Sequence, residues 1–335
     1  MSPALLMAGV LVAALTAYLL LGGADFGAGV WDLLARGPRK QQQRELIEHA
    51  IGPIWEANHV WLIFAAVVLF GAFPAAFAAI STALHVPLTL FLIGIVFRGS
   101  AFVFRSYDPE HRGRWGPLFS IASVISPFLL GAAVGTLASG RIRMEGAAVS
   151  SGFFWPWLAP FPFAVGALTL ALCAFLAATY LAREAQEGPL REDFRKKALG
   201  ASGVLLGLSL LTLGLAHGGA PRIFAGLVGG SATPVVVAGA LAALTAGWAL
   251  NRRRYGVARL AAGAFATLLF AGWAISQHPY LIVPDLTLEA AASNPRTLQA
   301  LLWATLAGIP ILGPSLWLLF KVFKSPRQMP PPSGA

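Results

Sequence analysis

The feature that most constrains the fold is a series of uninterrupted apolar runs, each long enough to cross a lipid bilayer. A transmembrane α-helix needs about 20 mainly apolar residues, and it bonds its backbone polar groups internally. Nine such runs are present: Ala4–Gly23, Ile54–Ala72, Ala76–Phe104, Leu118–Ala138, Phe161–Leu181, Ala198–Ala216, Ala232–Leu250, Arg259–Ile275 and Leu301–Phe320. These runs predict an all-α, polytopic membrane bundle of about nine transmembrane helices.

The composition agrees with a lipid-embedded chain. Hydrophobic residues make up 57% of the sequence and charged residues only 11%, whereas an ordinary soluble domain has roughly 25% charged residues. Such a chain lacks the polar groups to cover a water-facing surface, so its excess apolar surface must face lipid.

The basic residues lie mainly on one side of the predicted membrane. The chain has 24 Lys and Arg and a net charge of +10. All but Arg141, Arg143, Arg222 and Arg296 fall in or beside the connections after the odd-numbered spans. Cytoplasmic loops carry an excess of Lys and Arg, so we expect the N-terminus outside and the C-terminus in the cytoplasm. The positive charge is explained by this topology, and no nucleic-acid partner is expected.

We expect residues 1–328 to form a single membrane domain. Within it, a first helix group (about 1–182) and a second (198–328) are joined by a charged cytoplasmic linker at 183–197. Residues 329–335 contain three consecutive prolines that begin at position 330. We expect this segment to be a disordered tail.

The densest polar stretch is Trp55-Glu56-Ala-Asn58-His59-Val-Trp61. On a helix, Glu56 and His59 lie about 60° apart on one face, and Asn58 and Trp61 share another. Ionisable groups inside a membrane usually have a function, so one hypothesis is a proton relay from Glu56 to His59. The alternative is that Glu56, in the first turn of its helix, only complements the helix dipole.

Asp25 follows the first predicted span in a glycine-rich stretch and, like Glu56, lies toward the cytoplasm. Two acids on the cytoplasmic side of adjacent helices suit an entry for protons. The alternative is an ordinary interfacial aspartate beside glycines that let helices pack closely.

Three more residues of the third span are candidates for structural or partner contacts. His85 is placed near mid-depth, where it either pairs with His59 to hold a b-type haem or makes a hydrogen bond between helices, the favoured interpretation. Arg98 and Arg105 lie near the inner end of the span. Their side chains could bind Asp25, Glu56 or a quinone head group. The default expectation is that both arginine side chains extend to lipid phosphate.

Four segments together resemble subunit II of cytochrome bd-type quinol oxidases, closest to the cyanide-insensitive branch. They are Gly-Ala-Asp25-Phe-Gly-Ala-Gly, Trp55-Glu56-Ala-Asn58-His59-Val-Trp61-Leu-Ile, Phe97-Arg98-Gly-Ser-Ala-Phe-Val-Phe-Arg105, and Pro279-Tyr-Leu-Ile-Val-Pro284 with the stretch from Leu286 to Ser293. The match spans nearly the whole chain in order, and the Trp-acid-x-Asn-x-x-Trp motif is quite specific.

The resemblance implies a multi-pass protein of a bacterial or archaeal-type cell (inner) membrane, not catalytic alone, that pairs with a haem-bearing subunit I. That partner holds haem b and haem d (or b in its place), oxidises quinol and reduces oxygen to water. The present chain is expected to bind no haem and no metal, to stabilise subunit I and to contribute a cytoplasmic proton route through the acid at Glu56. Some members of the family also hold a structural quinone or lipid, or small single-helix subunits.

One departure from the family pattern bears on the proton route. Many members have a second acid three residues before the position of Asp25, where this sequence has Gly22. Two other functions remain as alternatives. A secondary transporter would need matching broken helices in both halves, and a di-haem b-type carrier would use His59 and His85.

Overall fold

The computed structural model describes residues 2–52, 55–107, 112–146, 148–185 and 188–324. Within these ranges, nine helices are long and apolar enough to cross a membrane, which confirms the predicted fold class. They are α1 (Pro3–Leu33), α3 (Trp55–Ala72), α5 (His85–Tyr107), α6 (Arg112–Ala138), α7 (Pro160–Glu184), α8 (Pro189–Gly219), α10 (Thr233–Asn251), α11 (Tyr255–Gln277) and α13 (Pro295–Lys324).

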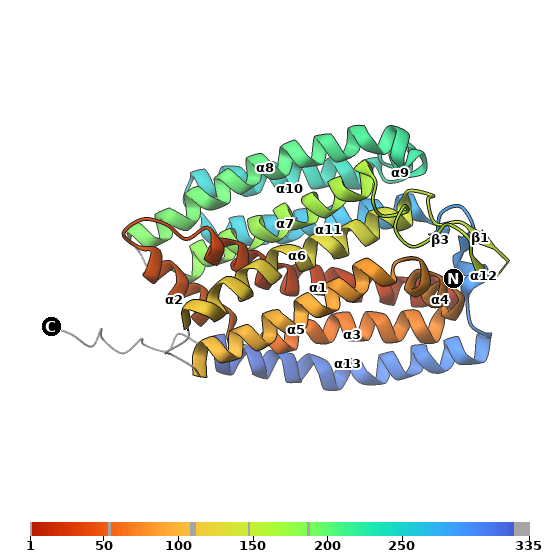
Figure 1. Cartoon of the computed structure of the whole chain (residues 1–335), viewed down its shortest axis with the longest axis horizontal. Helices are drawn as coiled ribbons and strands as arrows, with labels where there is room; N and C mark the ends of the chain where they lie inside the picture. Colours follow the sequence, from red (N-terminus) through yellow and green to blue (C-terminus); the bar gives the residue numbers. More distant parts are fainter. Residues whose placement is uncertain (1, 53–54, 108–111, 147, 186–187, 325–335) are drawn as a thin grey trace.

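Short elements lie at the two ends of the bundle (Figure 1). The amphipathic helix α2 (Lys40–Ile51) is at one end. At the other are α4 (Pro74–Ala83), α9 (Pro221–Leu227), α12 (Leu288–Ala291) and two small antiparallel hairpins. One pairs β1 (Met144–Glu145) with β2 (Ala148–Val149), and the other pairs β3 (Tyr280–Ile282) with β4 (Leu286–Thr287). The positive charges place the α2 end in the cytoplasm, and this orientation stays a prediction.

Helix α1 is the centre of the packing. It contacts α3, α6 and α7, and α7 in turn packs against α6, α8 and α11. The contact between α1 and α7 depends on Gly27, because a Cβ there would lie 1.8 Å from the backbone oxygen of Cys173. Small residues allow membrane helices to approach this closely. Helix α13 has the opposite character: no residue in its apolar window is buried, and it lies at the edge of the bundle (Figure 1).

The prediction that Ala76–Phe104 forms one continuous helix is wrong. Helix α4 ends at Ala83, and α5 begins at His85. The cause is Pro87, whose ring would clash with the carbonyl of Ala83 four residues earlier in a continuous helix. In the first turn of a new helix a proline is tolerated, because its missing N–H would have no partner there.

Two other expected boundaries differ. The first span continues ten residues beyond Gly23, to Leu33, so Asp25 lies inside a helix and not after it. Helix α8 begins at Pro189, so part of the expected linker 183–197 is helical. Residue 54, expected to open the second span, and the predicted tail 329–335 lie outside the described residues.

Polar contacts join α2 and the segment that precedes it to the beginning of α8. The Arg39 guanidinium donates two hydrogen bonds to Asp193, at 2.6 and 2.7 Å, and these bonds raise the pKa of Arg39. The Gln43 amide nitrogen also donates to Asp193, and Lys197 donates to the Gln43 oxygen. The ion pair and the amide thus hold α2 against the start of α8.

Candidate functional site

The buried face of α1 carries three polar residues at seven-residue intervals: Tyr18, Asp25 and Asp32. All three are buried, and Asp32 has no exposed surface. Seven residues make nearly two helical turns, so the three side chains lie on one face about 10 Å apart. A buried column of polar side chains from α3, α5 and α6 meets this face.

The middle of the column is the pair of Asp25 and Asn58. Asn58 lies on α3, and its Nδ2 donates to Asp25 Oδ2 at 2.5 Å. The Asn58 Oδ1 atom is buried and has no hydrogen-bond partner among the described residues. Asp25 and Asn58, both predicted from the sequence, are therefore in direct contact, and an acceptor oxygen remains for another donor.

About two turns further toward the N-terminus of α1, Tyr18 contacts His59. The Tyr18 hydroxyl and His59 Nδ1 are 3.3 Å apart and form a hydrogen bond. The His59 ring also packs against Phe26 and Trp55, with ring centroids 5.8 and 6.4 Å away. Its Nε2 atom is buried without a hydrogen-bond partner in the described part of the chain. His59 thus offers one nitrogen to a further group.

Arg98 lies inside the bundle, and the expectation that it extends to lipid phosphate is wrong. Only 1% of its surface is exposed. Its guanidinium lies over the rings of Phe26 and Phe119, and Nε donates to Ser123 Oγ at 3.1 Å. Its charge interacts with Asp25. Arg98 therefore supplies a positive charge to the centre of the column.

Arg105 is also buried, at 7% exposure, and forms the inner end of the column with Asp32. Its Nη1 donates to Asp32 Oδ1 at 2.9 Å, and Ser120 Oγ donates to Oδ2 at 2.8 Å. Arg44 Nε lies 3.7 Å from the same carboxylate, and Glu48 Oε2 lies 3.6 Å from Arg105 Nε. This closed network has the character of a structural ion pair.

Asp32 was not among the predicted residues. The expected helix end at Gly23 placed it in a connection, where an aspartate needs no buried partner. Its seven-residue spacing from Asp25 is the sequence signal that points to a shared helix face.

Glu56 lies apart from this column. Its side chain is exposed at the beginning of α3, on a stripe with Val60, Ile63, Val67 and Phe70, which are all more than half exposed. The spacing of four, three, four and three residues places them on one helix face. Glu56 therefore faces away from Asn58.

Two further predicted residues, Trp55 and Trp61, pack within the chain. Trp55 contacts Phe102 and His59, and Trp61 packs against the core that surrounds the N-terminal half of α1. Both tryptophans position α3 and have no direct role in the polar column.

We expected His85 near mid-depth in the membrane. In the structure it is the first residue of the α5 span, so this expectation is wrong. It is exposed, its Nδ1 is 3.0 Å from the Thr82 carbonyl oxygen, and its ring packs on Phe153. Its contacts share no residue with those of His59. Among the described residues, no group of three His, Cys, Asp or Glu side chains is placed to hold a metal ion.

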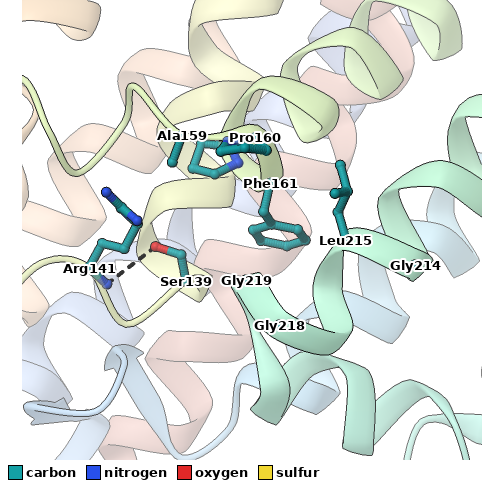
Figure 2. Close-up of a pocket in the computed structure, with 10 residues that line it drawn as sticks. Ser139, Arg141, Ala159, Pro160, Phe161, Gly214, Leu215, Gly218 and Gly219 are labelled. Carbon is teal, nitrogen blue, oxygen red and sulfur yellow. Dashed lines mark hydrogen bonds between the residues drawn. The ribbon is translucent and has the colours of Figure 1, made fainter.

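Two cavities lie at different places in the bundle. One, of about 450 Å³, contains Asp25 and Asn58 in its wall. The other, of about 370 Å³, lies near the opposite end beside Arg141, Phe161 and Gly219 (Figure 2). Figure 2 shows Arg141 bonded through its backbone to Ser139 at the edge of that second cavity. None of the predicted site residues lines the second cavity, so the functional interest lies in the first.

Comparison with known proteins identifies the family. The family model of cytochrome bd terminal oxidase subunit II matches residues 3–323. The structure of bd oxidase from Geobacillus thermodenitrificans has a TM-score of 0.83 and 25% identity, and it covers 96% of this chain and 99% of that one.

Curated relatives agree. Cytochrome bd-I ubiquinol oxidase subunit 2 of Escherichia coli K12 is 32% identical over 183 residues, 52% of this chain and 46% of the relative, so the match spans about half its length. Cytochrome bd ubiquinol oxidase subunit 2 of Bacillus subtilis 168 is 35% identical over 134 residues, 39% of each chain. With its membrane-spanning helices, the protein is a multi-pass protein of the cell (inner) membrane. The chain belongs to the cytochrome bd terminal oxidase subunit II family.

Proposed function

We propose that this chain is the second subunit of a membrane quinol:oxygen oxidoreductase and is not catalytic alone. The family match over residues 3–323 and the similarity to a bd oxidase structure support this assignment. In the proposed complex, subunit I holds haem b and haem d (or b in its place), oxidises quinol and reduces oxygen to water. The present chain stabilises subunit I and supplies protons to it from the cytoplasm.

The exposure of Glu56 is the observation that carries the proton route. Its carboxylate stands at the end of an exposed apolar stripe, while its neighbours Asn58 and His59 belong to the buried column. An ionisable group on a lipid-facing surface is costly, so a partner that covers the stripe and accepts the proton accounts for both features. We assign subunit I to this face of α3.

Three buried polar atoms support a proton path within the column that contains Asp25 and His59. Asn58 Oδ1, His59 Nε2 and Arg98 Nη2 are buried without hydrogen-bond partners among the described residues. Buried polar atoms are nearly always satisfied, in many cases by water. We infer that water molecules bridge these atoms. In this route Asp25 accepts the proton, His59 and water carry it along α3, and Glu56 delivers it across the interface.

Glu56→Gln tests the route in the complex purified through a tag on this chain. The amide keeps the size of the side chain but cannot carry a proton, so quinol-driven oxygen consumption should fall by on the order of tenfold or more. The matched control is Glu45→Gln, an exposed acid on α2 outside the column, which should consume oxygen at the wild-type rate. Wild-type oxygen consumption by Glu56→Gln refutes the proton role.

The same purification tests the assignment to an oxidase. The tagged chain should bring with it a partner whose absorption spectrum shows haem. A chain that is purified alone and moves a solute across vesicles would instead favour a transporter.

A further inference from the structure

The cavity of about 450 Å³ lies between α1, α2, α3, α7 and α11 and has a polar end and a charged end, with apolar side chains in the rest of its wall. Liquid water occupies about 30 Å³ per molecule, so the volume has room for on the order of ten water molecules. The wall consists of Leu20, Leu21, Ala24, Asp25, Ala28, Ala50, Ile51, Asn58, Ala177, Tyr180, Leu181, Arg183, Glu184 and Arg259.

The polar end is the pair of Asp25 and Asn58. Both side chains are more than nine-tenths buried, at 4% and 1% exposure. Asn58 uses its amide nitrogen to bond Asp25, which leaves Oδ1 as a buried acceptor without a partner in the described residues. A wall that carries a carboxylate and a free amide oxygen calls for a small hydrogen-bond donor, and water or hydronium satisfies both groups.

The charged end lies where α7 ends and α11 begins. Arg183 and Glu184 are exposed there, and the Arg259 guanidinium lies over the ring of Tyr180, 5.1 Å from its centroid. This is the end of the bundle that also holds α2 (Figure 1), and the distribution of Lys and Arg places it in the cytoplasm. The cavity therefore joins exposed charged side chains to a buried carboxylate.

Protein groups pack closely on two other sides of α1 near Asp25. Along α1, Asp32 is fully buried and held by Arg105 and Ser120. On the side of α7, Gly27 lies so close to the Cys173 backbone that not even a Cβ would fit.

We propose that this cavity is the cytoplasmic proton inlet of the chain, with Glu184 as the group that collects protons at its mouth. The inference rests on the proposed function. Glu184 releases a proton to the water in the cavity, each water accepts one proton and donates another, and the Asp25 carboxylate takes up the last one. Asp25 then passes its proton on along the proposed route and Glu184 regains one from the cytoplasm, so both carboxylates return to their starting states. This inlet needs no acid at position 22, where the chain has glycine.

Cysteine accessibility tests the hydration and direction of the inlet. Ala28→Cys introduces a thiol in the cavity wall, and a membrane-impermeant cationic methanethiosulfonate is added to inverted and to right-side-out vesicles that contain the complex. The native Cys173 is buried, so the parent protein should give a low background. Ala14→Cys is the matched control, because Ala14 is equally buried on the same helix but outside the cavity.

We expect modification of Ala28→Cys in inverted vesicles, where the cytoplasmic side is outward, and none of Ala14→Cys on either side. No modification of Ala28→Cys, or modification from the other side alone, would overturn the proposal.

Turnover measurements test the role of Glu184. Glu184→Gln should lower the turnover number several-fold and leave the KM for quinol unchanged, and Glu184→Asp should restore most of the rate. Glu184 is exposed, so its replacement should not impair folding. Wild-type turnover by Glu184→Gln rejects it as the collecting group. If Glu56→Gln lowers turnover while Glu184→Gln and the accessibility test are negative, the inlet is wrong and the proposed function stands.

Discussion

The network around Asp32 predicts a large and measurable loss of stability. Asp32 has no exposed surface and accepts bonds from Arg105 at 2.9 Å and Ser120 at 2.8 Å. It joins α1 to α5 and α6, and through Arg44 to α2. Asp32→Asn keeps the shape of the side chain and removes the charge that Arg105 faces.

Loss of one partner from a buried ion pair costs about 3–5 kcal/mol, because the other charge stays buried. Arg105 retains Glu48 at 3.6 Å, so we place the loss for Asp32→Asn near the lower bound, at about 3 kcal/mol. Arg105→Gln should cost about as much. The double variant should cost less than the sum by about 1–2 kcal/mol, since the two residues interact directly.

The assay is equilibrium unfolding of the tagged chain in mixed detergent and SDS micelles. Ser126→Ala serves as a control, because this buried hydroxyl donates to the Ala122 carbonyl oxygen of its own helix. It should change the unfolding free energy by less than about 1 kcal/mol. If the effects of Asp32→Asn and Arg105→Gln are additive within about 0.5 kcal/mol, the buried pair contributes no coupling and the reasoning fails.

Two further perturbations follow from contacts elsewhere in the bundle. Gly27→Val should reduce the yield of folded protein strongly, because its Cβ alone would lie 1.8 Å from the Cys173 oxygen. A Cβ at Gly9 meets no atom of the described residues within 4 Å, so Gly9→Val should fold normally. Equal yields would contradict the close packing of α1 on α7. Arg39→Gln removes the ion pair with Asp193 and should speed amide hydrogen exchange in α2 at low salt. Because the pair is partly exposed, the difference from wild type should shrink at about 1 M salt, and a salt-independent difference would argue against an electrostatic origin.

The sequence predicts the bundle well because lipid imposes a simple rule. A helix that crosses a bilayer needs a long apolar run, and all nine expected spans contain such a helix or its greater part. The length of the apolar run does not predict the break at Leu84, although its cause, Pro87, stands four residues after Ala83 in the sequence. The end of α1 differs from the expected one because Asp25 interrupts the apolar run of the sequence, while in the structure it is a buried polar residue of a longer helix.

The polar column is harder to predict, because it depends on which helices meet. The sequence places Asn58 and His59 on α3, but their partners Asp25 and Tyr18 belong to α1, and periodicity within one helix does not reveal neighbours in space. Arg98 and Arg105 were expected to reach lipid phosphate, the usual outcome for an arginine near a helix end. They are buried because Ser123, Asp32 and two phenylalanine rings provide the partners that lipid would otherwise supply.

The seven-residue spacing on α1 also bears on how the protein is made. The first two-thirds of this helix contain no charged residue, and its apolar window has the highest mean hydropathy of the candidate spans, at 2.4. The insertion machinery can therefore commit α1 to the bilayer as it emerges from the ribosome. Asp25 and Asp32 follow later and lack their partners until α3, α5 and α6 have been synthesised. A chain that stops before α5 and α6 would keep the Asp32 carboxylate in the membrane without Arg105 and Ser120, the two groups that pair with it.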